Sequence, residues 1–281
     1  METHRGYQEE GPPGATVPGE WRTAHETRVA PPVVQPYVER TYLTAQDKLF
    51  GSQTLDARRA KLIRETYLLL SVAVASAMLG GWIAGGRGDA SWPIVEFFWS
   101  GLGLMVTMFC LWFIPMIAFN VARNNPRLGV PALAFDGFMS GMILGPLVFV
   151  GLLYSGGDNA SGTNLVHAAL IITAAVFGAV TFYIHSSGQY FQAPRGLLFG
   201  TFVALTVGAM MSWFHILTGV FTTILAIGIG IFGTVTLIYS TSEILNDPDY
   251  DTPAYGALCL FASLFNIFQS VLYLLLGSSR D

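Results

Sequence analysis

Two acidic residues in the apolar part of this sequence stand where an acid could do chemistry. After residue 65 the chain has nine Asp or Glu residues, and four of them lie within Leu237–Pro253, between two long apolar runs. Glu243 is the first of these four, and Asp136 stands alone near the start of an earlier apolar run. A carboxylate inside a bilayer is costly unless it faces protein or water. Asp136 and Glu243 are therefore candidate residues for a cation or proton site.

Neutral polar residues extend this candidate site along two predicted helix faces. Spacings of three and four residues place side chains on one face of a helix. Such spacings relate Thr236, Ser240 and Glu243 in one apolar run, and Cys259, Ser263, Asn266 and Ser270 in the next. We group Asp136, Glu243 and Asn266 as a candidate polar centre. The competing interpretation, which we favour from the sequence, is that Glu243 lies at the membrane interface and that the hydroxyl stripes join helices.

The sequence does not contain a complete calcium-binding, metal-binding or catalytic motif. Asp247, Asp249 and Asp251 have the alternate spacing that begins a calcium loop, but threonine and leucine occupy its sixth and twelfth positions, where glycine and glutamate are needed. His167 and His185 are about 27 Å apart along one predicted helix and cannot share a metal. GxSxG, HExxH and CxxC do not occur. We therefore predict no catalytic residue, metal site, cofactor or nucleic-acid partner.

Composition places the chain in a lipid bilayer. The 281 residues are 52% hydrophobic and 11% charged, with a mean hydropathy of +0.52. A membrane helix needs about 20 consecutive apolar residues. The apolar runs predict an all-α membrane protein with seven spans: Thr66–Ala84, Glu96–Val121, Ala132–Tyr154, Leu165–His185, Gly196–Phe214, Gly219–Thr241 and Ala254–Leu276.

Basic residues predict how these spans are oriented. Four bases precede the first span, two lie between the second and third, and one lies between the fourth and fifth: Arg58, Arg59, Lys61, Arg64, Arg123, Arg127 and Arg195. The other side has only Arg87 and Arg280. Bases are enriched in cytoplasmic loops. The pattern predicts a cytoplasmic N-terminus and, with seven spans, an external C-terminus.

The N-terminal region differs from the rest of the chain. Gly11–Pro36 contains six prolines and three glycines among charges of both signs. Such a segment buries too little apolar surface to offset the entropy of ordering. We expect residues 1–54 to form a disordered cytoplasmic tail, and residues 55–281 to form the seven-helix membrane domain.

Three stretches of the membrane domain resemble a known family. AFDGFMSGMILGPLVFVGLLY, IFGTVTLIYSTSEIL and ALCLFASLFNIFQSVLYLLLGSSRD, in that order, look like the Bax inhibitor-1-like (TMBIM) family, and the last resembles its bacterial YccA-like branch. The resemblance covers about residues 60–281. It implies a bundle in which a central hydrophobic helix is surrounded by six others, in the bacterial inner membrane.

The resemblance also assigns a role to two serines. Channel-like members of the family pair two aspartates on the sixth and seventh helices as a proton-sensitive latch for calcium leak. The matching positions here are Ser240, in Tyr239-Ser240-Thr241, and Ser263, in Leu260-Phe261-Ala262-Ser263. Hydroxyl groups do not titrate near neutral pH. The latch is therefore not expected to operate in its usual form.

This departure directs the choice of function. YccA-like proteins are associated with the membrane AAA protease FtsH, which grips them by a cytoplasmic N-terminal tail. The resemblance implies a non-enzymatic inner-membrane protein that modulates membrane-protein quality control or stress responses, with the bilayer and an FtsH complex as partners. The alternative is a calcium or proton leak channel that uses Asp136 and Glu243 in place of the missing pair.

Overall fold

The structure is a computed structural model that describes residues 37–155, 165–188, 190–191, 195–213, 219–247 and 250–278. Within these residues the secondary structure is helical, with one short 3-10 helix, η1 (Gly88–Ser91), and eight α-helices: α1 (Tyr37–Gly85), α2 (Trp92–Trp99), α3 (Gly101–Asn124), α4 (Pro126–Ser155), α5 (Leu165–Ser187), α6 (Arg195–Trp213), α7 (Val220–Asn246) and α8 (Pro253–Ser278). The chain divides into two units, Met1–Gly51 and Ser52–Asp281, and the packing described below lies within the second.

Helix α1 begins earlier than the sequence suggested. The predicted tail extended to residue 54, whereas residues 37–54 are helical. Pro36 is the last proline before the helix, and residues 37–50 contain neither proline nor glycine, so nothing in that stretch opposes helix formation. Residues 1–36 lie outside the described residues, and their predicted disorder stays a prediction.

Six of the described helices are long and apolar enough to cross a membrane. They are Ala57–Gly85 in α1, Gly101–Asn124, Arg127–Leu153 in α4, Leu165–Ser187, Val220–Asn246 and Pro253–Ser278. The fifth predicted span, Gly196–Phe214, forms the shorter helix α6, whose apolar part is Gly196–Ser212. The predicted break between the fifth and sixth spans falls where α6 ends at Trp213 and α7 begins at Val220.

The second predicted span is broken near its start. Glu96–Val121 was expected to be one helix, but α2 ends at Trp99 and α3 begins at Gly101. Ser100 has extended backbone angles, and its side chain accepts a hydrogen bond from the Gly103 N–H, 3.0 Å away, which caps α3. A side chain at Gly103 would collide with the Phe97 carbonyl. The break falls within the predicted span Glu96–Val121, whose length suits a single membrane helix, so length alone did not reveal it.

Helices α1 and α4 run parallel in close contact. A Cβ atom added at Gly137 would meet the backbone of Ala73, and one at Gly141 would meet the backbone of Ala77. The residue numbers increase together along both helices, which fixes their relative direction. Small residues at four-residue spacing let helix backbones approach. Gly137 and Gly141, four residues apart, therefore form a close helix contact.

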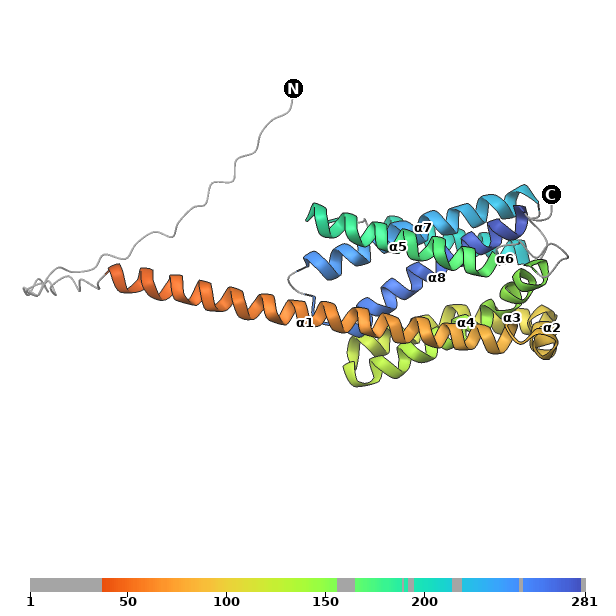
Figure 1. The fold of residues 1–281 in the computed structure, drawn as a ribbon, viewed down its shortest axis with the longest axis horizontal. Coiled ribbons are helices and arrows are strands. Elements are labelled where there is room, and N and C mark those ends of the chain that lie inside the picture. The colour runs from red at the N-terminus through yellow and green to blue at the C-terminus, as the bar shows by residue number, and fades with distance from the viewer. Residues whose placement is uncertain are drawn as a thin grey trace, which may run out of the picture. The chain divides into compact units, whose positions relative to one another are not determined.

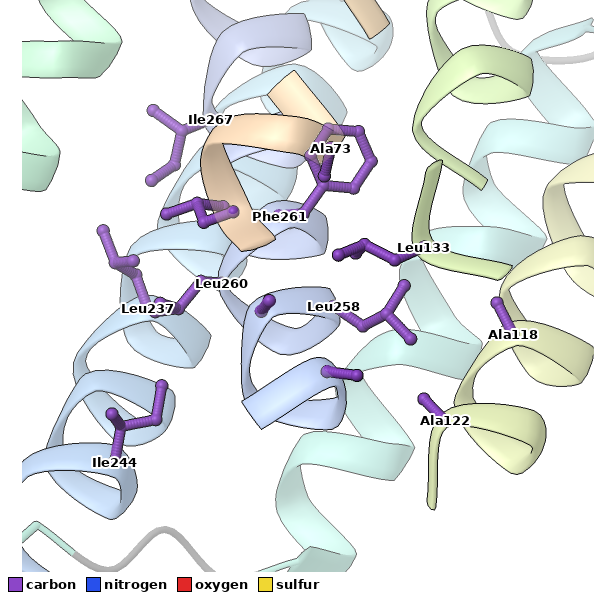
Figure 2. Packing of buried hydrophobic residues seen from close by; sticks show 13 residues of the cluster. Ala73, Ala118, Ala122, Leu133, Leu237, Ile244, Leu258, Leu260, Phe261 and Ile267 are labelled. Atoms are coloured by element: carbon purple, nitrogen blue, oxygen red, sulfur yellow. The ribbon is translucent and has the colours of Figure 1, made fainter. Parts of the chain in front are cut away.

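Helix α8 packs against α3, α4, α5 and α7 and supplies six of the thirteen residues of the main buried cluster. Leu258, Leu260 and Phe261 from α8 lie among Leu133 of α4 and Leu237 of α7, as Figure 2 shows. Figure 1 shows α8 passing between α4 and the pair formed by α5 and α7. This helix is the centre of the hydrophobic packing.

Contacts between helices also give the directions of α6, α7 and α8. Thr236 in α7 meets Ser263 in α8, and Ala226 meets Ser270, so α7 and α8 are antiparallel. The rings of Phe202 in α6 and Phe232 in α7 have centroids 6.4 Å apart. Gly208 of α6 packs against Leu225 of α7. Helices α6 and α7 are therefore also antiparallel.

Candidate functional site

A polar pocket of about 450 Å³ lies where α3 and α7 end and α8 begins. We call it the polar pocket, and its lining is Arg123, Tyr239, Glu243, Asp247, Tyr250, Asp251, Thr252 and Tyr255. Three carboxylates face one guanidinium in this lining, so the pocket has an acidic balance. Three tyrosines supply ring faces and hydroxyl groups. This arrangement suits a cation or a group that donates hydrogen bonds.

The turn between α7 and α8 supplies half of this lining, and local hydrogen bonds shape it. The Asp247 N–H donates to the Glu243 carbonyl at 3.0 Å, which ends α7. Thr252 Oγ1 donates to Asp251 Oδ1 at 2.7 Å. Pro253 then starts α8, because its fixed backbone angle suits the first helical position. Asp247, Tyr250, Asp251 and Thr252 thus form one wall of the pocket.

Helix α1 forms two hydrogen bonds here, one to the last turn of α7 and one to the turn that follows it. Arg59 Nη2 donates to the Leu245 carbonyl at 2.5 Å, one of the last carbonyls of α7, which lack partners within the helix. A cation is also favourable at a helix C-terminus. Thr66 Oγ1 lies 2.7 Å from the Tyr250 hydroxyl. Residues close to the N-terminal region are therefore in direct contact with the wall of the pocket.

Tyr250 is the most constrained group of the turn. Burial raises the pKa of its hydroxyl above the ordinary value, and nearby Glu243 raises that pKa further. Thr66 Oγ1 lies 2.9 Å from the Leu62 carbonyl, to which it donates, so Tyr250 can be the donor in the Thr66–Tyr250 bond. A side chain at Gly256 would collide with the Tyr250 hydroxyl. Tyr250 therefore stays a neutral donor at physiological pH.

The two serines that the family resemblance assigns to latch positions, Ser240 and Ser263, lie buried between α7 and α8. Ser240 is 6% exposed and Ser263 is 1% exposed. Ser263 Oγ lies 3.0 Å from Thr236 Oγ1 and 2.8 Å from the Cys259 carbonyl oxygen. The Ser240 side chain forms a hydrogen bond with the Cys259 thiol. Each serine has its own bonding partners, and both sets contain only uncharged groups.

The candidate polar centre is not gathered into one pocket. Glu243 lines the polar pocket, whereas Asp136 and Asn266 are not part of its lining. Asp136 is 4% exposed, and its Oδ1 has no hydrogen-bond partner among the described residues. Asn266 packs against Gly233, which is ten residues, or about 15 Å, from Glu243 along α7. Helix spacing did not predict which residues would share a cavity.

Several residues of the pocket were not singled out by sequence reasoning. Arg123, Tyr250 and Tyr255 come from three different segments, and only their folding together makes them neighbours. The sequence of the turn does not match a calcium loop, although its acids have the alternate spacing of one. Within the described part of the chain, no group of three His, Cys, Asp or Glu residues is placed to hold a metal ion. Acidic residues and one arginine line the polar pocket together, so it is a site of mixed charge.

Comparison with known proteins gives one family match and distant relatives. Residues 59–281 match the family described as "Inhibitor of apoptosis-promoting Bax1". The chain is 27% identical over 221 residues to "Modulator of FtsH protease YccA" of Escherichia coli K12, covering 79% of this chain and 92% of that protein. A second E. coli strain has the same similarity in a protein called "Inner membrane protein YccA". An uncharacterized Neisseria meningitidis protein is 27% identical, covering 78% of this chain and 92% of its own.

Proposed function

Because the chain belongs to the family of inhibitors of apoptosis-promoting Bax1, whose pattern matches residues 59–281, we propose that it is a non-enzymatic membrane protein that modulates membrane-protein quality control. The proposed partner is a membrane AAA protease of the FtsH type. The name of the E. coli relative, which is matched over 92% of its length, supports this choice.

The observation that carries the proposal is the chemistry at the latch positions. Ser240 and Ser263 are hydroxyl groups that bond to Cys259 and Thr236. No carboxylate stands at either position, so no coupled acid pair exists there to respond to pH. At these two positions the chain therefore lacks the titrating groups that a proton-gated calcium leak of the usual kind needs. The modulator activity associated with the relative's name needs no such pair.

We further propose seven membrane crossings, a cytoplasmic N-terminus and an external C-terminus. Helices α1, α4 and α8 run in one direction, since Gly129 meets Ala254 and Gly151 meets Leu272. Helix α7 runs against α8, and α6 runs against α7, which supports α6 as a further crossing although it is short. We place the chain in the bacterial inner membrane, and the name of the second E. coli relative, an inner membrane protein, supports this location.

Affinity purification tests the modulator proposal. The tagged chain, solubilised from native membranes in mild detergent, should recover an FtsH-type protease, and a variant that lacks residues 1–36 should recover much less, because the tail is the proposed handle. The protease should also degrade a short-lived membrane substrate more slowly when the full chain is overproduced. Recovery of no protease and an unchanged substrate half-life would together reject the proposal.

The second candidate function is a cation or proton leak that uses Glu243 and Asp136. The acidic balance of the polar pocket and the unpartnered Oδ1 of buried Asp136 favour it. In liposomes at constant pH, such a leak would carry calcium or protons, and Glu243→Gln and Asp136→Asn would each reduce the flux strongly. A wild-type flux equal to that of empty liposomes would reject this candidate.

A further inference from the structure

A second cavity, of about 740 Å³, lies between α1, α4, α5 and α8 and shares no lining residue with the polar pocket. We call it the apolar cavity. Leucine, valine, methionine and phenylalanine side chains form most of its wall, with small residues such as Ala75, Gly81 and Ala174 between them. The small residues hollow the wall where larger side chains would fill it.

The hydroxyl groups in the lining of this cavity are already bonded to their own helices. Ser71 Oγ donates to the Tyr67 carbonyl at 3.0 Å, and Thr173 Oγ1 donates to the Ala169 carbonyl at 2.8 Å. A buried water needs two to four polar partners, and apolar cavities stay dry. The chemistry of the wall therefore favours a hydrocarbon occupant.

The length of the cavity suits a hydrocarbon chain. Its lining runs from Val166 to Phe177 on α5, about 17 Å, and from Leu70 to Gly86 at α1, about 24 Å. Both lengths exceed half of a hydrocarbon core about 30 Å thick and stay within the whole of it. The cavity is partly open at its side, where Met78 is 56% exposed, so a hydrocarbon chain can enter it from the bilayer.

One end of the apolar cavity has the residues of a membrane interface. Trp82 lines this end from the last turn of α1, Gly86 lines it directly after that helix, and His167 lines it from the first turn of α5. Trp82 is 59% exposed, and tryptophan is enriched where hydrocarbon meets the lipid headgroups. A lipid whose headgroup lies at this end would place its acyl chain along the cavity.

We propose that the apolar cavity is a binding site for an acyl chain of a membrane phospholipid, taken from the leaflet at the Trp82–His167 end. The occupant is a structural lipid, held by contact with α1, α4, α5 and α8 together. Its chain fills space that these helices leave between them, and it stabilises the contact of α1 with α5 without any polar bond. The site is independent of the polar pocket and of the proposed protease partner.

Native mass spectrometry of the full chain, purified from bacterial membranes in mild detergent, tests the proposal. The wild type should retain phospholipid in stoichiometric amount. Ala174→Trp should lose most of it, because the indole would occupy the cavity. Ala175→Trp is the matched control: Ala175 is also exposed on α5 but does not line the cavity, and this variant should retain lipid as the wild type does.

Gly81→Phe provides a second variant if Ala174→Trp fails to fold. A Cβ at Gly81 would make only an ordinary contact, 3.5 Å from the Gly141 carbonyl oxygen, so the ring can enter the cavity without moving α4. The proposal is overturned if the wild type retains no phospholipid, if the cavity-filling variants retain as much as Ala175→Trp, or if the retained molecule is an isoprenoid or a polypeptide.

Discussion

Two helix pairs of the bundle are held together by opposite means. Helices α1 and α4 touch because Gly137 and Gly141 lack side chains, so that backbone meets backbone. Helices α7 and α8 are joined through side chains, by the Ser263–Thr236 contact and by the bond from Ser270 Oγ to the Ala226 carbonyl. In the first pair a side chain at Gly137 or Gly141 would collide with the α1 backbone, whereas in the second pair one hydrogen bond can be lost while the packing remains.

The difference also separates structure from function. At Gly137 and Gly141 the α1–α4 contact is between backbone atoms, and we expect it to hold the bundle together. The α7–α8 contact contains Ser240 and Ser263, the two proposed latch positions, and the polar pocket lies where α7 ends and α8 begins. Acids at those positions would place charge where this chain has serine hydroxyls bonded to Thr236 and Cys259. The comparison predicts which changes should unfold the protein and which should alter its activity.

The largest effect is expected at the α1–α4 contact. Gly141→Leu would force its side chain into the backbone of Ala77 and should destabilise the protein by about 3 kcal/mol, the upper range for overpacking. Thermal unfolding in detergent measures the loss. Gly178→Ala is the control, because no atom lies within 4 Å of a Cβ at that helical position, and it should be neutral or slightly stabilising. Equal melting temperatures for the two variants would contradict the close contact.

A smaller effect is expected at the turn that α1 holds. Tyr250→Phe removes the hydroxyl bonded to Thr66 and should cost about 1 kcal/mol, the usual net value of one hydrogen bond. Tyr183→Phe is the control, because Tyr183 is 54% exposed on α5. Loss of stability in the control but not in Tyr250→Phe would show that the Thr66–Tyr250 bond contributes nothing.

The same tyrosine predicts a dependence on alkaline pH. Because burial raises the folded-state pKa of Tyr250 above its unfolded value, the native state holds this proton more tightly. The stability linked to Tyr250 is therefore complete below about pH 10, the unfolded value, and decreases as the pH rises toward the folded pKa. Unfolding measured from pH 8 to 11 should show a steeper decline for wild type than for Tyr250→Phe. Parallel curves would contradict the burial of the hydroxyl.

The smallest effect is expected within the α7–α8 contact. Ser270→Ala removes the 2.7 Å bond to the Ala226 carbonyl and should cost about 0.6 kcal/mol, the average for hydrogen bonds between membrane helices. Ser278→Ala, whose bond stays within α8, serves as the control. A loss for Ser270→Ala as large as that for Gly141→Leu would show that the two contacts do not differ as described.

The sequence predicted the elements better than it predicted the site. Apolar runs located the membrane helices because hydrophobic length is what the bilayer selects. They missed the break at Ser100, where one serine and one glycine decide the geometry within an unbroken apolar run. The spacing of Ser240 and Glu243 predicted that both lie on one face of a helix. It could not predict that Arg123 and Tyr255 would line the same pocket as Glu243, because this depends on where α3, α7 and α8 end and how they are oriented.

Calcium flux into liposomes that contain the purified chain, measured between about pH 6 and pH 8, tests the central proposal that Ser240 and Ser263 stand where channel-like relatives pair two acids. We expect the wild type to show little pH-dependent flux. Ser240→Asp combined with Ser263→Asp should give a pH-sensitive leak that neither single change gives, because only the double variant has a coupled acid pair. Strong pH-dependent flux in the wild type, abolished by Glu243→Gln or Asp136→Asn, would contradict this proposal and establish the channel instead.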